Sequence, residues 1–240
     1  MKTLKIHIIL YFISFVNIGL SQNYRTIFGS DYENALSFCK INSTRFNQTA
    51  NFFAIDTSLM VSVVFPEIVR YSYFKDFFET SALEIAYKLV GSDAADFSIG
   101  HFQMKPSFIE KMEEWFKMIN QNPKYRFIYT YTESLPEKIR EIRLMRLKNL
   151  QWQMNYLACF VLITDYRFSN KNWQSQSAKI KFYASAYNSG FYIDEKIIQH
   201  NITKKCFPFG FKSSPDDQYS YCEVSNDFYY HYYRLIFQKK

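Results

Sequence analysis

Glu67 is the residue of this sequence best suited to acid–base chemistry. It lies in the apolar run 63–69, where burial would raise the pKa of its carboxyl group by disfavouring the charged form. A carboxyl group whose pKa lies near neutrality can both give up and take back a proton. Pro66 comes directly before it and lacks the backbone N–H of a regular helix. The pattern therefore predicts a general acid/base that enters a cleft at a break in its helix.

Two later segments carry small and polar residues at fixed spacing. Residues 96–108 read D-F-S-I-G-H-F-Q-M-K-P-S-F, and residues 186–190 read A-Y-N-S-G. Each alone is a weak signal, because G-x-x-Q is common by chance and A-Y-N-S-G could be an ordinary helix end. The order of a glutamate at the end of an apolar helix, then S-x-G-x-x-Q-x-x-P, then A-Y-N-x-G is more specific.

This order resembles the lytic transglycosylase family, in which a helix ending in E-S is followed by G-L-M-Q-x-x-P and then A-Y-N-x-G. Gly100, Gln103 and Pro106 keep the spacing of the middle motif, and residues 186–190 match the third. The run 54–59, A-I-D-T-S-L, is similar to the family segment G-V-D-P-x-L before the catalytic helix. The resemblance spans residues 54–190.

Three departures mark the chain as a divergent member of that group. Ile68 stands where the family usually has serine, and Pro66 stands inside what should be regular helix. The interval between Glu67 and Gln103 is also wider than in the family, and a helix over residues 75–89 would fill it.

The resemblance implies an enzyme that breaks the MurNAc–GlcNAc bond of peptidoglycan with one catalytic residue, Glu67, and no metal or cofactor. In the family this glutamate first protonates the leaving oxygen and then removes a proton from the muramyl 6-hydroxyl, which closes a 1,6-anhydro ring. The resemblance further implies that Tyr187 hydrogen-bonds Glu67, that Gln103 and Asn188 contact the sugar, and that Ser98 places it. It also implies that two glycines allow a close backbone approach in the site, namely Gly100 and Gly190.

Three other functions compete with this prediction. Asp96 would be the base if the enzyme were a hydrolytic lysozyme of the goose type, a group related in fold. A non-catalytic wall-binding or accessory protein on the same scaffold would not need a buried acid. A net charge of +7 and 20% aromatic residues also suit a nucleic-acid binder, but the basic residues form no single run, and the export signal argues against it.

Residues 1–21 have the pattern of a cleavable secretory signal. Lys2 and Lys5 precede an apolar stretch that is too short for a comfortable membrane span of ~20 residues, and small residues lead to a cut after Ser21. We therefore expect a monomer exported to the periplasm or the extracellular space, where it acts on peptidoglycan glycan strands and is not inserted in a membrane.

The four cysteines allow a disulfide in an exported protein. Cys206 and Cys222 flank a short loop rich in Pro, Gly and Asp, and we expect them to pair. Cys159 lies in an apolar run and is expected to be a buried free thiol. The four histidines are scattered and no C-x-x-C occurs, which predicts no metal site.

The fold predicted from these patterns is mainly α, a lysozyme-like single domain over residues 22–205. A Tyr-rich tail over residues 206–240 is expected to be strand or loop, pinned by the disulfide. Helices are predicted over residues 31–40, from 57 onward after an Asp56 cap, 75–89, 106–119, 137–164, 175–188 and 194–200.

Overall fold

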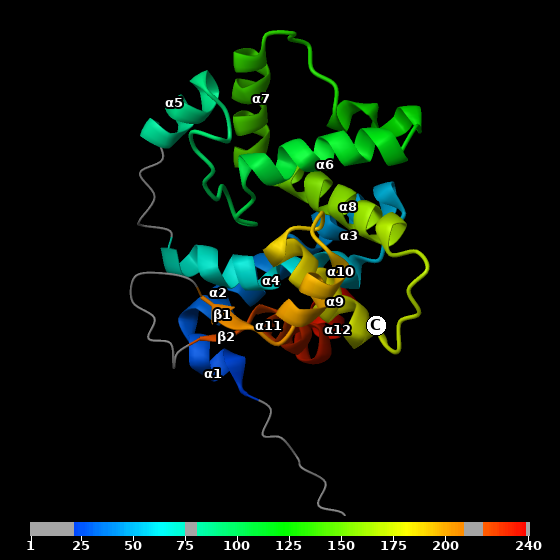
Figure 1. Cartoon of the computed structure of the whole chain (residues 1–240). Coiled ribbons are helices and arrows are strands. Elements are labelled where there is room, and N and C mark those ends of the chain that lie inside the picture. The colour runs from blue at the N-terminus through cyan, green and yellow to red at the C-terminus, as the bar shows by residue number, and fades with distance from the viewer. Residues whose placement is uncertain (1–21, 75–80, 209–217, 239–240) are drawn as a thin grey trace, which may run out of the picture.

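The computed structural model describes residues 22–74, 81–208 and 218–238, and these form a mainly helical fold (Figure 1). The predicted signal peptide, residues 1–21, lies outside the described residues. The helices are α1 Tyr24–Phe28, α2 Ser30–Ile41, α3 Ser43–Phe53, α4 Thr57–Phe74, α5 Ser81–Leu89, α6 Pro106–Ile119, the 3₁₀ helix η1 Pro123–Ile128, α7 Pro136–Lys148, α8 Leu150–Arg167, α9 Gln176–Ser189, α10 Glu195–Asn201, α11 Tyr221–Phe228, the π-helix η3 Tyr229–Tyr233 and α12 Arg234–Phe237. The short strands β1 Lys205–Phe207 and β2 Tyr219–Ser220 pair antiparallel.

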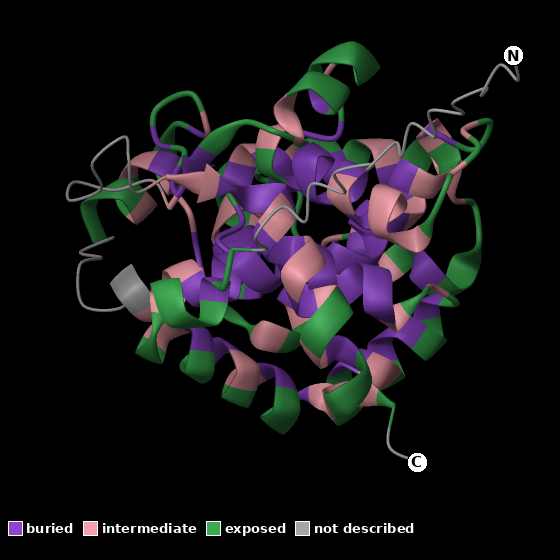
Figure 2. Ribbon diagram, turned by 90° about the horizontal axis from the view of Figure 1, so that it is seen from below, coloured by how far each residue is buried: buried purple, intermediate pink, exposed green. Residues whose placement is uncertain are grey.

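Helix α8 forms the centre of the molecule, as its apolar second half predicts. It contacts α3, α4, α6, α7 and α9, and every residue from Tyr156 to Val161 is fully buried. Figure 1 shows α5, α6 and α7 on one side of it and α4, α9 and α11 on the other. Exposed residues follow the outward faces of the outer helices, while the buried ones fill the interior (Figure 2).

Local signals account for most helix ends. Pro106 and Pro136 each occupy the first turn of a helix, where a missing N–H costs nothing. Ser175 and Asp194 accept hydrogen bonds from the backbone N–H groups of the helices that follow them. Helix α4 runs through Pro66 and continues to Phe74. The proline therefore interrupts the backbone hydrogen bonding of α4 without ending the helix.

The single helix predicted over residues 137–164 is wrong, because the chain forms two helices that meet at Asn149. This residue has extended backbone angles, and its side chain accepts a hydrogen bond from the N–H of Trp152. Asn149 thus caps α8 and lets it turn away from α7. Helix α3 was not predicted from the sequence.

The prediction that the tail is strand or loop is correct only for its first part. Beyond β1 and β2 the chain forms α11, which packs against α4 and α9. Ser220 accepts a hydrogen bond from the N–H of Glu223, and the residues that recur on one face of α11 are buried. Helix α11 is therefore part of the main core.

The predicted disulfide is not formed, since all four cysteines are free and buried. Cys206 lies within β1, and Cys222 lies in the first turn of α11. The two ends of the intervening loop are joined by the β1–β2 ladder, which pairs Lys205 with Ser220. This pairing holds the two ends of the loop together, which is the role predicted for the disulfide. Cys159 is a buried free thiol as expected.

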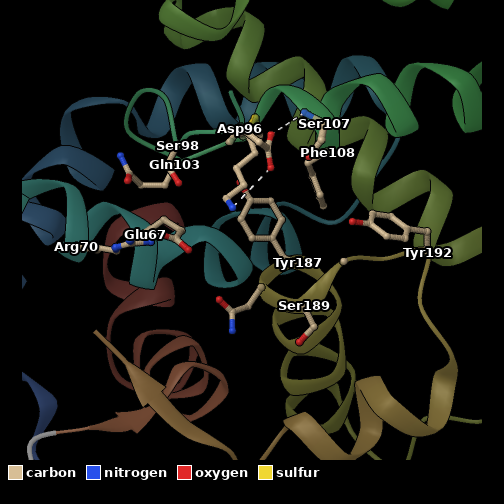
Figure 3. Close-up of a pocket in the computed structure, with 14 residues that line it drawn as sticks. Glu67, Arg70, Asp96, Ser98, Gln103, Ser107, Phe108, Tyr187, Ser189 and Tyr192 are labelled. Atoms are coloured by element: carbon tan, nitrogen blue, oxygen red, sulfur yellow. Dashed lines mark hydrogen bonds and ion pairs between the residues drawn. The ribbon is translucent and has the colours of Figure 1, made fainter. Parts of the chain in front are cut away.

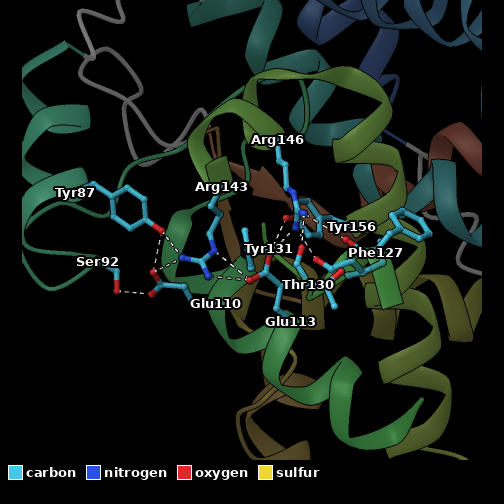
Figure 4. Close-up of polar contacts among 11 residues, drawn as sticks. Tyr87, Ser92, Glu110, Glu113, Phe127, Thr130, Tyr131, Arg143, Arg146 and Tyr156 are labelled. Carbon is cyan, nitrogen blue, oxygen red and sulfur yellow. Dashed lines mark hydrogen bonds and ion pairs between the residues drawn. The ribbon is translucent and has the colours of Figure 1, made fainter. Parts of the chain in front are cut away.

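A buried cluster of charged and tyrosyl side chains joins α6, α7 and α8 (Figure 4). Arg143 of α7 donates to Glu113 at 2.8 Å and to Glu110 at 3.0 Å, both on α6. Tyr156 of α8 and Tyr131 also donate to Glu113. Arg146 donates to three backbone carbonyl groups in residues 127–130. Each charge in this cluster is compensated, which is the condition for burying it.

Two further findings concern the described part of the chain. No helix there is long and apolar enough to cross a membrane. The same residues contain no group of three or more histidine, cysteine, aspartate or glutamate side chains arranged to hold a metal ion.

Candidate active site

A cavity of about 260 Å³ lies between α4, the segment that leads into α6, and the end of α9 (Figure 3). It brings together side chains that are far apart in the sequence. Of the residues singled out from the sequence, its lining contains Glu67, Asp96, Ser98, Gln103, Tyr187, Asn188 and Gly190. Gly100 does not line it but shapes the turn that carries Gln103.

Glu67 lies at one wall of this cavity and is 6% exposed. Its Oε2 atom is buried and accepts no hydrogen bond from the described residues, although Nη1 of Arg70 lies 3.5 Å away. Burial raises the pKa of Glu67 to about 7, while the positive charge of Arg70 acts in the opposite direction. A carboxyl group in this state is protonated at mildly acidic pH and exchanges its proton near neutrality.

The raised pKa predicts how folding stability depends on pH. The ordinary pKa of this carboxyl group is 4.5, and in the fold it is about 7. Between these values the folded protein holds a proton that the unfolded chain has released, so the stability due to Glu67 is full below pH 4.5 and is lost as the pH rises through 7. We expect Glu67→Gln to gain about 3 kcal/mol over the wild type between pH 4.5 and pH 8.

Urea unfolding of both proteins across this pH range measures that difference. Because every other titrating group is shared, the difference between the two curves isolates Glu67. Parallel curves would show that Glu67 titrates at its ordinary pKa in the fold.

Tyr187 does not make the hydrogen bond expected of it. Its hydroxyl donates to the backbone carbonyl of Phe102 at 2.8 Å. Burial raises the pKa of this phenol well above its usual range, and the nearby Glu67 adds to the effect. The hydrogen bond to Phe102 ties α9 to the turn that bears Gln103. Tyr187 therefore forms part of the cavity wall and fixes the position of the opposite segment.

Tyr221, in the first turn of α11, lies against Glu67 and was missed from the sequence. Its hydroxyl donates to the carbonyl of Val63 at 3.1 Å, and the same hydroxyl lies close enough to the Glu67 carboxyl group to favour its charged form slightly. The signal for this helix was present in the sequence. Ser220 and Glu223 have the spacing of a capping box, which marks a helix start.

Gln103 is carried by a tight turn that has a short antiparallel bridge between Ile99 and Met104 at its base. Its Nε2 donates to the Gly100 carbonyl at 2.9 Å, which leaves Oε1 buried and without a partner among the described residues. Gln103 and Gly100 both have positive φ, of 50° and 70°. The turn holds a hydrogen-bond acceptor in the cavity at the cost of backbone strain.

Gly100 is expected to tolerate no side chain. A Cβ atom there would lie 1.8 Å from Nε2 of Gln153, a fully buried residue that accepts from the N–H of Phe102 and donates to the carbonyl of Leu147. Displacing Gln153 leaves buried polar groups unpaired, at about 1–3 kcal/mol each. We expect Gly100→Ala to lower the free energy of unfolding by at least about 2 kcal/mol.

Gly29→Ala is the matched control, because Gly29 also has positive φ but no atom lies within 4 Å of the added carbon. It should show only the cost of placing a side chain at positive φ, about 1–3 kcal/mol, and Gly100→Ala should lose more because it also displaces Gln153. Equal losses in the two variants, measured by chemical unfolding, would show that Gln153 moves aside freely.

Two further residues that were predicted to bind the sugar also line the cavity. Ser98 belongs to the segment before α6, and Asn188, which also hydrogen-bonds Cys206, is exposed at the end of α9. Gly190 ends α9 with a φ of 105°, and an added carbon there would lie 3.1 Å from the ring of Tyr192. Its lack of a side chain leaves space for that ring at the cavity rim.

Asp96 faces the same cavity but is engaged in holding the structure. Its Oδ1 accepts from the N–H of Ser107 at 3.0 Å in the first turn of α6, and Oδ2 lies 3.6 Å from Nζ of Lys105 (Figure 3). The aromatic residues near these motifs serve packing: Phe97 and Phe102 are buried in the core, and Tyr71 packs against His101.

Comparison with known proteins adds no relative: no family model, no curated protein and no solved structure matches this chain. The described residues thus form a mainly helical protein in which a buried glutamate, with a pKa raised by desolvation, lies at the wall of a polar cavity.

Proposed function

We propose that this protein is a peptidoglycan-cleaving lytic transglycosylase with a lysozyme-like fold and that Glu67 is its catalytic acid/base. The observation that carries the proposal is the buried Glu67 carboxyl group, whose pKa is about 7, at the wall of a polar cavity. The motif residues Gln103 and Asn188 line the same cavity, as the order of motifs in the sequence predicts.

In the proposed reaction Glu67 performs two proton transfers. As the neutral acid it protonates the glycosidic oxygen of the leaving sugar, and as the resulting carboxylate it removes the proton from the muramyl 6-hydroxyl. That hydroxyl attacks the anomeric carbon and closes the 1,6-anhydro ring. A pKa near the working pH suits a group with both roles, because neither protonation state is then strongly disfavoured.

The cavity contains hydrogen-bonding groups that can bind an N-acetylated sugar. The unpartnered Oε1 of Gln103 can accept a hydrogen bond from an N-acetyl N–H or a hydroxyl group. Ser98 and Asn188 offer further donors and acceptors on opposite walls. No metal or cofactor is required for this reaction. Export to the periplasm or the extracellular space, and action as a monomer, are part of the same proposal.

Product analysis tests the proposal. Purified peptidoglycan is digested with the wild-type protein, and the soluble fragments are separated and weighed by mass spectrometry. We expect 1,6-anhydromuramyl ends, which are lighter than hydrolytic ends by one water. If the glycan stays intact and the protein sediments with it, the protein is instead a wall-binding accessory protein.

A hydrolytic lysozyme is the second candidate, favoured by the presence of Asp96 in the same cavity as Glu67. In an inverting reaction a second carboxylate activates water across the sugar. Digestion in ¹⁸O-labelled water distinguishes the two, since only hydrolysis places the label on the product. If labelled ends form and Asp96→Asn abolishes them, Asp96 is the base and the transglycosylase proposal is wrong.

A further inference from the structure

Arg70 is the charged neighbour of Glu67 within α4. The two residues lie three positions apart, so their side chains leave the same face of the helix. Nη1 of Arg70 is 3.5 Å from Oε2 of Glu67, and the Arg70 side chain is 25% exposed against 7% for that of Glu67. Both residues line the cavity, and Figure 3 shows the guanidinium group directed at the carboxyl group.

The other ionisable side chains around Glu67 are either neutral or paired with an opposite charge. Tyr187 of α9 and Tyr221 of α11 are both buried, and burial raises the pKa of each phenol well above its usual range, so both remain neutral. Asp96, on the far wall of the cavity, lies 3.6 Å from the ammonium group of Lys105. Arg70 is therefore the dominant charge acting on Glu67 among the described residues.

We propose that Arg70 is a positioning residue that sets the pH range over which Glu67 can serve as both acid and base. This inference rests on the proposed function, in which one carboxyl group must first give up and then take back a proton. Burial alone would hold Glu67 in the protonated state, and a fixed positive charge beside it restores access to the carboxylate. Arginine suits this role because its guanidinium group keeps its charge when it is partly buried.

Direct titration of Glu67 tests the proposal without any need for activity. The side-chain carboxyl carbons of glutamate are labelled with ¹³C, and the Glu67 signal is assigned as the one missing from Glu67→Gln. In Arg70→Met we expect its midpoint to move upward by about one pH unit, because a neighbouring cation lowers the pKa of a carboxyl group by that order. Arg70→Lys keeps the charge and should retain most of the wild-type midpoint.

Arg25→Met is the matched control for a lost arginine–glutamate pair. Arg25 binds Glu33 through two hydrogen bonds on α1 and α2, away from the cavity, and its removal should leave the Glu67 midpoint unchanged. Thermal unfolding of each variant verifies that the fold is intact. An unchanged midpoint in folded Arg70→Met would overturn the proposal, as would an equal shift in Arg25→Met.

The pH dependence of cleavage provides the second readout. The alkaline limb of the rate profile reports the protonated form of Glu67, and in Arg70→Met it should move to higher pH by the same amount as the titration. If the wild type does not cleave glycan but the titration moves as expected, the proposed function fails while the role of Arg70 in the ionisation of Glu67 stands. If the wild type cleaves glycan but Arg70→Met changes neither the titration midpoint of Glu67 nor the alkaline limb of the rate profile, the proposed role of Arg70 is wrong and the proposed function stands.

Discussion

Glu67→Gln is expected to abolish glycan cleavage while the protein remains folded. Proton transfer by a positioned general acid contributes ~10²–10⁴-fold to rate, and here the same group serves both steps. The amide cannot donate the proton that the leaving oxygen needs. Because the cavity favours the neutral state of the carboxyl group, a neutral amide of the same shape fits without a stability penalty. Release of anhydro fragments from peptidoglycan, followed over time, measures the effect.

Glu141→Gln provides the control for this substitution. Glu141 lies on the outer surface of α7, where it pairs with Lys88 and Lys138, and its replacement should leave the rate unchanged. Near-normal cleavage by Glu67→Gln would show that another group is the acid. Loss of cleavage in both variants would point to a general effect on the fold.

Arg143→Met is expected to cause the largest loss of stability. Arg143 is 8% exposed and compensates Glu113 and Glu110 within the buried cluster between α6 and α7. Removing one partner of a buried ion pair costs about 3–5 kcal/mol, because the remaining charge stays in a poorly solvated position. Natural domains are stable by only about 5–15 kcal/mol, so the variant should lose a large share of its stability. Urea unfolding gives the value.

Two further variants separate buried charge from general disruption. Lys138→Met breaks a solvent-exposed pair with Glu141 and should leave the free energy of unfolding almost unchanged, because exposed ion pairs are well solvated. The double variant Arg143→Met/Glu113→Gln should regain part of the loss, because the second change removes the uncompensated charge. If the double variant is as unstable as the two single losses added together, the two side chains do not act as a pair.

The parts of the fold that were predictable are those encoded by adjacent residues. The helix starts at Pro106 and Pro136 follow from the missing N–H of proline, and the apolar run 157–163 indicates the buried part of α8. The break at Asn149 was not predicted, because the surrounding residues continue a helical pattern. Its position depends on the Asn149 cap, which competes with continuation of the helix, and local sequence does not distinguish the two.

The candidate site also has features that the sequence predicts and features that depend on tertiary structure. The resemblance of the motifs to the lytic transglycosylase pattern led us to expect Glu67, Gln103 and Tyr187 in one cavity, and all three line it, although Glu67 lies within α4 and not at its end. The partner of Tyr187 was not predictable, because its hydroxyl reaches the Phe102 carbonyl, whose direction depends on the positive φ values of the turn. Tyr221 was missed because the tail was treated as separate from the core.

The position of α11 makes the acidity of Glu67 depend on a part of the chain far from its own helix. Tyr221, at the start of α11, closes one side of the Glu67 environment. If α11 were detached from α4, water would reach the carboxyl group and burial would no longer raise its pKa to the same extent. The motif residues alone therefore do not set the acid strength that the proposed reaction needs, because that strength also depends on the docking of α11.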